Sequence, residues 1–318
     1  MKDTFKPPFW QIGGHFQTIY PSLFRKVPLP YKRERLILND GDFVDLDWVK
    51  TGSKRLILVT HGLEGDSTRH YVTGMIKKFV DAGFDGLGWN CRSCSGEINK
   101  NPRFYHHGDA EDLRQVVEHA IADMNYDEIF LAGYSMGGSL TLRLLAEKPE
   151  LLPAQVIMAV AASVPLDIHD SVIELHKKGK RFYMKRFLRK LGLKIKQKSI
   201  QFPENKKLSY VGYESKIKDF FDFDNNYTAP IHGYQSAIDF YEKASTKPIL
   251  KNIGIPVKIV QALNDPFLGD NCYDLGEAAT NPNVELVLTK YGGHVGFMQS
   301  GKKFNFVEDL ALTFYKSQ

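Results

Sequence analysis

Short apolar runs separated by polar or glycine-containing segments recur along this chain of 318 residues. A continuous run of four to eight apolar residues is typical of a strand that is buried on both faces of a parallel sheet. The clearest example covers residues 55–60 and ends directly before a loop that contains glycine. Strands are expected at residues 34–38, 43–49, 55–60, 84–90, 128–132, 155–162, 256–263 and 284–289.

The connections between these strands are one hairpin and several helices. Residues 39–42, Asn-Asp-Gly-Asp, join the first two strands, and Asp-Gly between apolar runs predicts a tight antiparallel turn. Asp109 is expected to cap the second of the helices. Helices are expected at residues 71–81, 109–122, 139–147 and 303–315. This alternation predicts an α/β fold with a mostly parallel, twisted sheet that is flanked by helices.

Residues 5–26 interrupt the alternation with six aromatic side chains among prolines and glycines. The prolines and glycines argue against a regular amphipathic helix. So many rings are also too apolar to stay in water. We therefore expect an arm of about residues 1–30 that wraps across the body of the protein and buries its rings. His15 and Gln17 either line a pocket or satisfy local backbone groups, and the second role is favoured.

Residues 168–245 interrupt the alternation a second time, between two expected core strands. Within them, residues 177–218 contain 15 Lys or Arg and two acidic residues, a local charge of +13 in a chain of net charge +5. An apolar stripe at helical spacing lies among these charges: Phe182, Met184, Phe187, Leu188 and Leu191. We expect a helical lid insertion. Three explanations of its charge stay open: a solvated face, attraction of anionic or amphiphilic substrates, and weak peripheral contact with an anionic membrane.

Composition narrows the class of protein. The 43% apolar content is ample for a core and argues against disorder. The small net charge gives no reason to expect nucleic-acid binding, and three cysteines fit a reducing compartment better than a disulfide framework. The chain shows neither the apolar core of a signal peptide nor an apolar run long enough to span a membrane. We expect one soluble, cytoplasmic domain over residues 1–318.

Residues 133–138, Gly-Tyr-Ser-Met-Gly-Gly, stand between an expected strand and an expected helix. G-x-S-x-G in this setting is typical of the nucleophile elbow of α/β-hydrolases, a sharp turn that presents the serine at the carboxyl end of the strand. Side chains two residues before and two after the serine would collide, which explains Gly133 and Gly137. The pattern predicts Ser135 as a nucleophile. The alternative is a glycine-rich turn with an incidental serine.

Two further residues complete a candidate triad. Asp265 directly follows an expected strand, and His294 lies in a glycine-rich loop after the last one. The order serine, acid, histidine is that of α/β-hydrolases, and all three positions fall at the carboxyl edge of the sheet. An imidazole makes the serine hydroxyl nucleophilic by taking its proton, and a carboxylate fixes the tautomer of that imidazole. Asp167, which follows an earlier strand, is the alternative acid.

The loop that begins with His61 and Gly62 matches the one that supplies an oxyanion-hole N–H group in this fold. The second donor is the residue after the nucleophile. We therefore expect the backbone N–H groups of Leu63 and Met136 to stabilise the tetrahedral intermediate. His61 itself is expected to shape the loop.

Two other motifs suggest different chemistry. Cys91 and Cys94 form a Cys-x-x-Cys motif, but a second metal-binding pair is missing and no helix is expected to begin at Cys91, so a structural loop is favoured. His106 and His107 are adjacent, and neighbouring side chains usually point apart, with no carboxylate spaced to complete a metal site. We expect neither a metal nor an organic cofactor.

Several stretches match one branch of this family: Gly13-Gly14-His15-Phe16-Gln17-Thr18, Cys91-Arg92-Ser93-Cys94-Ser95-Gly96-Glu97, Tyr105-His106-His107-Gly108, Gly133-Tyr134-Ser135-Met136-Gly137-Gly138, Phe223-Asp224, Ala229-Pro230-Ile231-His232-Gly233 and Asp265-Pro266-Phe267. The chain resembles the YheT-like branch of α/β-hydrolases over nearly its whole length, a bacterial branch related to the eukaryotic ABHD1/ABHD3 group. Two positions depart from it, Ser93 in place of glycine and Ser139 in place of asparagine. Both leave the triad intact and bear on the substrate pocket.

The resemblance implies a serine hydrolase, usually a carboxylesterase that acts on small-molecule acyl esters or lipids, with the triad on Ser135, Asp265 and His294. A related alternative is lipase-, phospholipase- or thioesterase-like activity on amphiphilic substrates. A non-catalytic ligand-binding protein is disfavoured, because such proteins often lose a triad residue and this chain retains all three.

Overall fold

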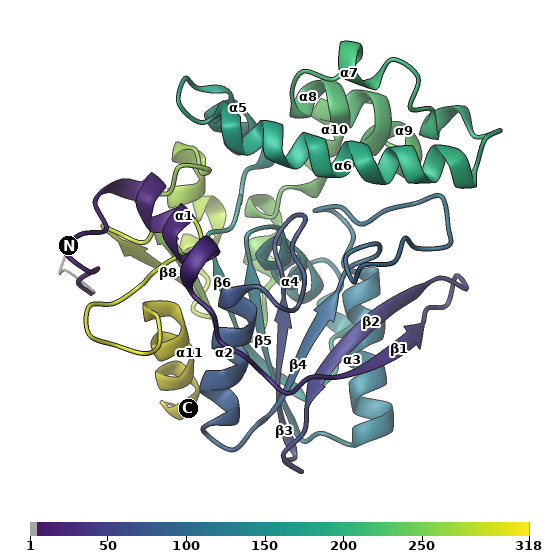
Figure 1. Cartoon of the computed structure of the whole chain (residues 1–318). Coiled ribbons are helices and arrows are strands. Elements are labelled where there is room, and N and C mark those ends of the chain that lie inside the picture. The colour runs from purple at the N-terminus through teal and green to yellow at the C-terminus, as the bar shows by residue number, and fades with distance from the viewer. Residues whose placement is uncertain (1–4, 318) are drawn as a thin grey trace.

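The computed structural model describes residues 5–317 and contains one eight-stranded sheet in the order β1-β2-β4-β3-β5-β6-β7-β8 (Figure 1). β2 pairs antiparallel with β1 and β4, and the other neighbours are parallel. The predicted fold class is thereby confirmed. The strands are β1 (Lys32–Ile37), β2 (Phe43–Val49), β3 (Arg55–Thr60), β4 (Asp85–Asn90), β5 (Glu128–Tyr134), β6 (Val156–Ala162), β7 (Val257–Ala262) and β8 (Val284–Thr289).

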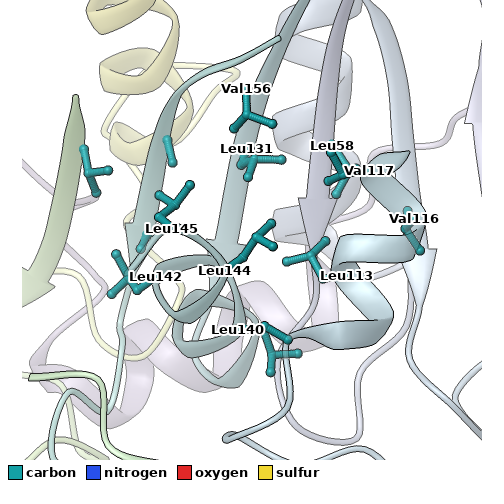
Figure 2. Packing of buried hydrophobic residues seen from close by; sticks show 14 of the residues in the cluster. Leu58, Leu113, Val116, Val117, Leu131, Leu140, Leu142, Leu144, Leu145 and Val156 are labelled. Atoms are coloured by element: carbon teal, nitrogen blue, oxygen red, sulfur yellow. The ribbon is translucent and has the colours of Figure 1, made fainter. Parts of the chain in front are cut away.

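Helices cover both faces of the sheet, because alternate residues of its central strands point to opposite sides. Leu56 and Leu58 of β3 pack into the cluster under α3 and α4, part of which is drawn in Figure 2. Ile57 and Val59 pack into the cluster under α2 and α11. The covering helices are α2 (His70–Val80), α3 (Glu111–Met124), α4 (Met136–Ala146) and α11 (Phe306–Lys316). Burial of each such side chain stabilises the fold by about 1.5–3 kcal/mol.

One predicted cap is wrong by a residue. α3 begins at Glu111, and Ala110 occupies its N-cap position. Asp109 lies just outside, where it accepts a hydrogen bond from the Glu111 N–H and forms an ion pair with Arg103. The ion pair holds the carboxylate one position before the cap.

The segment between β6 and β7 is helical and has a hydrophobic cluster of its own. It lies across the top of the view in Figure 1, above the sheet. No helix in the described part of the chain is both long and apolar enough to cross a membrane. The helices of this insertion are α5 (Ile168–His176), α6 (Arg181–Gln201), α7 (Tyr213–Lys216), α8 (Phe220–Phe223), α9 (Ala229–His232) and α10 (Ala237–Ala244).

The N-terminal segment differs from the expectation. Residues 13–24 form a regular helix, α1 (Gly13–Phe24), despite an internal proline. Phe5 is buried as expected and stacks on Phe306, but most of the other rings are exposed: Phe9, just before α1, is 91% exposed and Phe24 is 64% exposed. The buried positions of α1 are polar or small: Gln17, Thr18 and Pro21. The prediction failed because hydrogen bonds to distant loops stabilise this helix, and those contacts leave no local pattern.

Candidate active site

The sharp turn between β5 and α4 presents Ser135. Its backbone angles, φ 55° and ψ −124°, are rarely adopted by a residue other than glycine, and such strain persists only where the surroundings enforce it. Here the serine N–H donates to the Ala162 carbonyl at 2.9 Å. Ser135 is partly exposed, whereas the residues around it in β5 and α4 are buried. The turn therefore exposes the serine at the carboxyl end of β5.

The two glycines of this turn are required for different reasons. A Cβ atom on Gly133 would lie 2.3 Å from the Gly137 carbonyl oxygen, within the turn itself, as expected. A Cβ atom on Gly137 would lie 2.3 Å from the Thr60 carbonyl oxygen. Gly137 thus allows α4 to approach the end of β3. The sequence argument, which placed the collision between the two side chains, was wrong about Gly137.

Three side chains from separate loops form one hydrogen-bonded chain. Ser135 Oγ lies 2.9 Å from His294 Nε2, and His294 Nδ1 lies 2.9 Å from Asp265 Oδ2. Asp265 is 4% exposed and His294 is 6% exposed. In this geometry the imidazole can accept the serine proton, while the carboxylate holds the Nδ1–H tautomer and stabilises the imidazolium.

Phe267 restrains both partners of the serine. Its backbone N–H donates to Asp265 Oδ1 at 2.9 Å. Its ring stacks on the His294 imidazole with a centroid distance of 3.9 Å and an interplanar angle of 16°. The carboxylate and the imidazole are therefore held by one residue that follows β7.

Helix α1 holds the loop that carries His294. Thr18 Oγ1 accepts the His294 N–H at 2.8 Å, and Gln17 Oε1 accepts the Gly292 N–H at 2.8 Å. Gln17 Oε1 also accepts from Asn264 Nδ2 at 2.9 Å, which ties the loop before Asp265 to the same helix. Gln17 Nε2 also donates to the nearby Gln11 carbonyl at 2.8 Å, so Gln17 has the structural role that was favoured and in addition connects to distant loops.

The contact between α1 and these loops leaves no room for side chains. A Cβ atom on Gly14 would lie 1.8 Å from the Asn264 carbonyl oxygen, and one on Gly293 would lie 2.7 Å from the Gly14 carbonyl oxygen. Sequence reasoning missed the contribution of α1 to the site. The signal that could have found it was the glycine pair in residues 13–18, which the family resemblance had already singled out.

The expected oxyanion donors lie beside the serine. Met136 is the first residue of α4, so its N–H lies at the positive end of the helix dipole. Leu63 lies in the loop after β3 and lines the cavities at Ser135. His61 braces that loop, because its Nε2 accepts the Cys91 N–H at 3.1 Å and its Nδ1 lies 2.8 Å from the Gly62 carbonyl oxygen. The donor roles of Leu63 and Met136 stay a prediction.

The other candidate residues lie outside this hydrogen-bonded chain. The carboxylate of Asp167 accepts the Asp170 N–H and caps α5, whereas the histidine is paired with Asp265. Cys91 and Cys94 are free thiols in a turn that is closed by the hydrogen bond from Cys94 N–H to the Cys91 carbonyl. His106 and His107 line a cavity next to Ser135, and no group of three or more potential ligands within residues 5–317 could hold a metal ion.

Two cavities meet at Ser135 and His294. The first, of about 110 Å³, lies between the sheet edge and the insertion and is lined mainly by apolar side chains, among them Leu175, Phe187, Leu191, Phe220 and Phe240. The second, of about 230 Å³, lies between α1 and α6 and has a basic lining that includes Arg69, Arg186 and Lys190. We call them the apolar cavity and the basic cavity.

Part of the positive charge of α6 is buried instead of solvated. Lys194 Nζ donates to the buried Glu64 carboxylate at 2.6 Å, in the loop after β3. Lys198 is fully buried and donates to the carbonyl groups of Asn99 and Asn101 at 2.5 Å each. Burial lowers the pKa of Lys198 to about 8. A solvated face therefore explains only part of this charge.

Comparison with known proteins agrees with this geometry. Residues 55–300 match the family model described as the alpha/beta hydrolase fold. The chain belongs to the α/β-hydrolase family. It is 34% identical over 289 residues to YheT of Escherichia coli (strain K12), whose esterase assignment is itself provisional, with 89% of this chain and 84% of that protein covered.

Two other similar proteins widen the comparison. Phospholipase ABHD3 of Homo sapiens is 30% identical over 308 residues, which cover 93% of this chain and 74% of the relative. The predicted resemblance to the YheT-like branch and its eukaryotic relatives is thus confirmed. The Pyrococcus furiosus esterase Pf2001 superposes with a TM-score of 0.58 at 17% identity, covering 90% of this chain and 92% of that one, and supports the fold.

Proposed function

We propose that this α/β-hydrolase cleaves carboxylic esters through an acyl-enzyme, with Ser135 as nucleophile, His294 as general base and Asp265 as the orienting acid. The observation that carries the proposal is the continuous hydrogen-bonded chain from Ser135 Oγ through His294 to Asp265. The relatives support it, because YheT is provisionally named as an esterase and ABHD3 is named as a phospholipase.

The reaction follows from the positions of these groups. His294 Nε2 takes the Ser135 proton as Oγ attacks the ester carbonyl carbon. The backbone N–H groups of Leu63 and Met136 stabilise the negative charge on the carbonyl oxygen. Collapse of the intermediate breaks the ester C–O bond, and His294 returns the proton to the leaving alkoxide. Water, activated by the same histidine, then releases the acid.

The apolar cavity is the proposed acyl pocket. A protein cavity of about 150 Å³ holds benzene, which has six carbons. At about 110 Å³ the apolar cavity is smaller. By this comparison it holds an acyl chain of about four or five carbons, and activity on p-nitrophenyl esters is expected to be highest near butyrate and to fall at octanoate and beyond.

Substitution of the serine tests the mechanism. Ser135→Ala is expected to abolish labelling by a fluorophosphonate probe and to lower kcat for p-nitrophenyl butyrate by about 10⁴-fold or more, and His294→Ala by a similar factor. Ser139→Ala is the matched control: contrary to the expectation from the sequence, Ser139 is not among the residues that line either cavity, and its buried hydroxyl, one turn further along α4, has no hydrogen-bond partner among the described residues. Full activity of Ser135→Ala would refute the proposal.

A second candidate is the same hydrolysis at a lipid surface. Six large apolar side chains are exposed before and along α1, a set that we call the N-terminal patch: Phe9, Trp10, Ile12, Phe16, Leu23 and Phe24. α1 contacts the basic helix α6, where His15 stacks on Tyr183 with ring centroids 5.7 Å apart. Exposed rings beside exposed cations fit an anionic bilayer.

Vesicle binding tests this candidate. The protein is expected to sediment with vesicles that contain anionic lipid and much less with neutral vesicles, and added salt should weaken the binding. Phe24→Ser should reduce it, whereas Leu151→Ser, which removes a similarly exposed apolar side chain outside the patch, should not. Equal binding to neutral and anionic vesicles would contradict the electrostatic part of the idea.

A further inference from the structure

The basic cavity differs from the apolar cavity in its charge. Three cationic side chains contribute to its lining: Arg69 at the start of α2, and Arg186 and Lys190 one turn apart on α6. Five residues line both cavities, among them Ser135 and His294. An ester carbonyl at Ser135 therefore has an apolar space on one side and a cationic space on the other.

The carboxylates nearby neutralise only part of this charge. Glu64 also lines the basic cavity, and its Oε1 accepts hydrogen bonds from Lys194 Nζ and from the Tyr105 hydroxyl, each at 2.6 Å. Arg69 has a loose ion pair with Asp66, with 3.7 Å between Nε and Oδ2. Within the described residues, no carboxylate lies within ion-pair distance of the two basic residues on α6.

The hydrogen bonds of these cations leave donors free. Lys190 Nζ donates to the Glu64 carbonyl oxygen at 3.0 Å, and Arg69 Nη2 donates to the same oxygen at 3.1 Å. A lysine has three donors and an arginine has five. The pKa of Lys190 is lowered by burial and by repulsion from Arg69 and Arg186, which exceed the opposing effect of Glu64. An anion in the cavity would relieve that repulsion.

A buried histidine supports the same inference, that the basic cavity accommodates an anion. His70 lines the basic cavity and is largely buried, and neither of its ring nitrogens has a hydrogen-bond partner among residues 5–317. Burial and the nearby Arg25 and Arg69 lower its pKa to about 3, so the ring is neutral and carries one N–H donor. A buried polar side chain without a partner is costly.

We propose that the basic cavity binds the alcohol portion of the ester, that this portion carries an anionic phosphate or carboxylate group, and that Arg186 and Lys190 select for it. The proposal rests on the function proposed above. The ester C–O bond breaks, the proton from His294 goes to the alkoxide oxygen, and the anionic group leaves unchanged with the alcohol. Arg69, the N-cap residue of α2, adds a third cationic side chain that can donate hydrogen bonds to the anionic group.

Three butyrate monoesters test the proposal, those of glycerol, glycerol 3-phosphate and glyceric acid, which are neutral, a phosphate and a carboxylate. At least one anionic ester is expected to exceed the neutral ester tenfold in kcat/KM, and the comparison of the two anionic esters identifies the preferred group. Arg186→Gln and Lys190→Gln should each reduce that ratio at least threefold.

The matched control is Lys196→Gln. It removes one positive charge from an exposed position on the same helix, about 15 Å further along than Arg186, and the ratio should stay unchanged. The proposal is overturned if neither anionic ester exceeds the neutral one threefold, or if Lys196→Gln lowers the ratio as much as Arg186→Gln. If the protein hydrolyses p-nitrophenyl butyrate but none of the three butyrate monoesters, this inference is overturned and the proposed function stands. If it hydrolyses no ester at all, both are overturned.

Discussion

Thr18 and Gln17 connect helix α1 to the loop that carries His294, and neither touches the serine. The Thr18 hydroxyl donates to the Gly14 carbonyl at 2.7 Å and accepts the His294 N–H at 2.8 Å. It thereby fixes the backbone of the proposed base relative to α1. Thr18 is therefore a positioning residue for the reaction proposed here.

Replacement of Thr18 by valine keeps its shape and removes the acceptor. The buried His294 N–H then has no partner, which costs about 1–3 kcal/mol. Small misplacement of a catalytic group lowers the rate by up to about 100-fold. We expect Thr18→Val to lower kcat for p-nitrophenyl butyrate at least tenfold while the circular dichroism spectrum is unchanged.

Thr18→Ser separates positioning from packing. Serine keeps the hydroxyl and loses only a methyl group, so kcat is expected to stay within about threefold of the wild-type value. If serine and valine lower kcat equally, the hydroxyl does not position the histidine, and the effect belongs to packing against the loop.

At the scale of single residues, the sequence predicted the three members of the proposed triad but not the residues that hold them in position. Ser135, Asp265 and His294 each follow a strand, and the parallel strands of a sheet end at one edge, so their proximity follows from order alone. The contact of Thr18 with His294 spans 276 positions. A tertiary hydrogen bond between two loops produces no periodicity, and only the motif in residues 13–18 pointed to it.

Helix α6 shows why charge patterning left three explanations open. Its lysines at positions 190, 194 and 198 recur every four residues and so lie along one side of the helix. That side contacts the core loops, where Lys194 donates a hydrogen bond to the Glu64 carboxylate and Lys198 donates to two backbone carbonyl groups. A sequence does not reveal which side of an inserted helix finds buried acceptors.

Removal of one partner of the buried pair should detach α6 from the core. Lys194→Met leaves the Glu64 carboxylate buried without its counter-ion, which costs about 3–5 kcal/mol. We expect faster amide hydrogen exchange across residues 181–201 and a lower free energy of unfolding. Lys196→Met, at an exposed position on the same helix, should change neither quantity measurably.

The double variant Glu64→Gln/Lys194→Met removes both charges. It is expected to recover most of the stability lost in Lys194→Met, because no unpaired charge remains and the amide still accepts the Tyr105 hydrogen bond. Additive losses in a double-mutant cycle would contradict the ion pair as the attachment of α6.

At the scale of the whole molecule, the sheet was predictable and the cavities were not. The strands at 43–49, 55–60 and 284–289 match β2, β3 and β8 because their apolar residues, which alternate with polar ones in the first and are nearly continuous in the other two, are bounded by turns. The apolar cavity depends on how α5, α6 and α8 pack above the serine, and helix periodicity contains no information on that distance. The exposure of the N-terminal rings was missed because hydrogen bonds to distant loops, and not burial of these rings, stabilise α1.

Asp224 makes the stability of the fold around the apolar cavity depend on pH. It lines the apolar cavity and accepts hydrogen bonds from the hydroxyl groups of Thr228 at 2.5 Å and Tyr241 at 2.7 Å. Burial nevertheless raises its pKa to about 6, against 3.8 for the unperturbed group. Between these two values the folded protein retains a proton that the unfolded chain has lost, so the contribution of Asp224 makes stability fall as pH rises.

The fall amounts to about 1.4 kcal/mol per pH unit, or about 3 kcal/mol in all, and is complete above pH 6. His107 in the same cavity acts in the opposite direction, because burial lowers its pKa to about 4 and stability then rises with pH. The useful quantity is therefore the difference in free energy of unfolding between the wild type and Asp224→Asn, measured by urea denaturation from pH 4 to pH 7. We expect the wild type to lose about 3 kcal/mol relative to the variant over this range. A difference that is constant with pH would mean that Asp224 is ionised throughout and that the apolar cavity contains a buried charge.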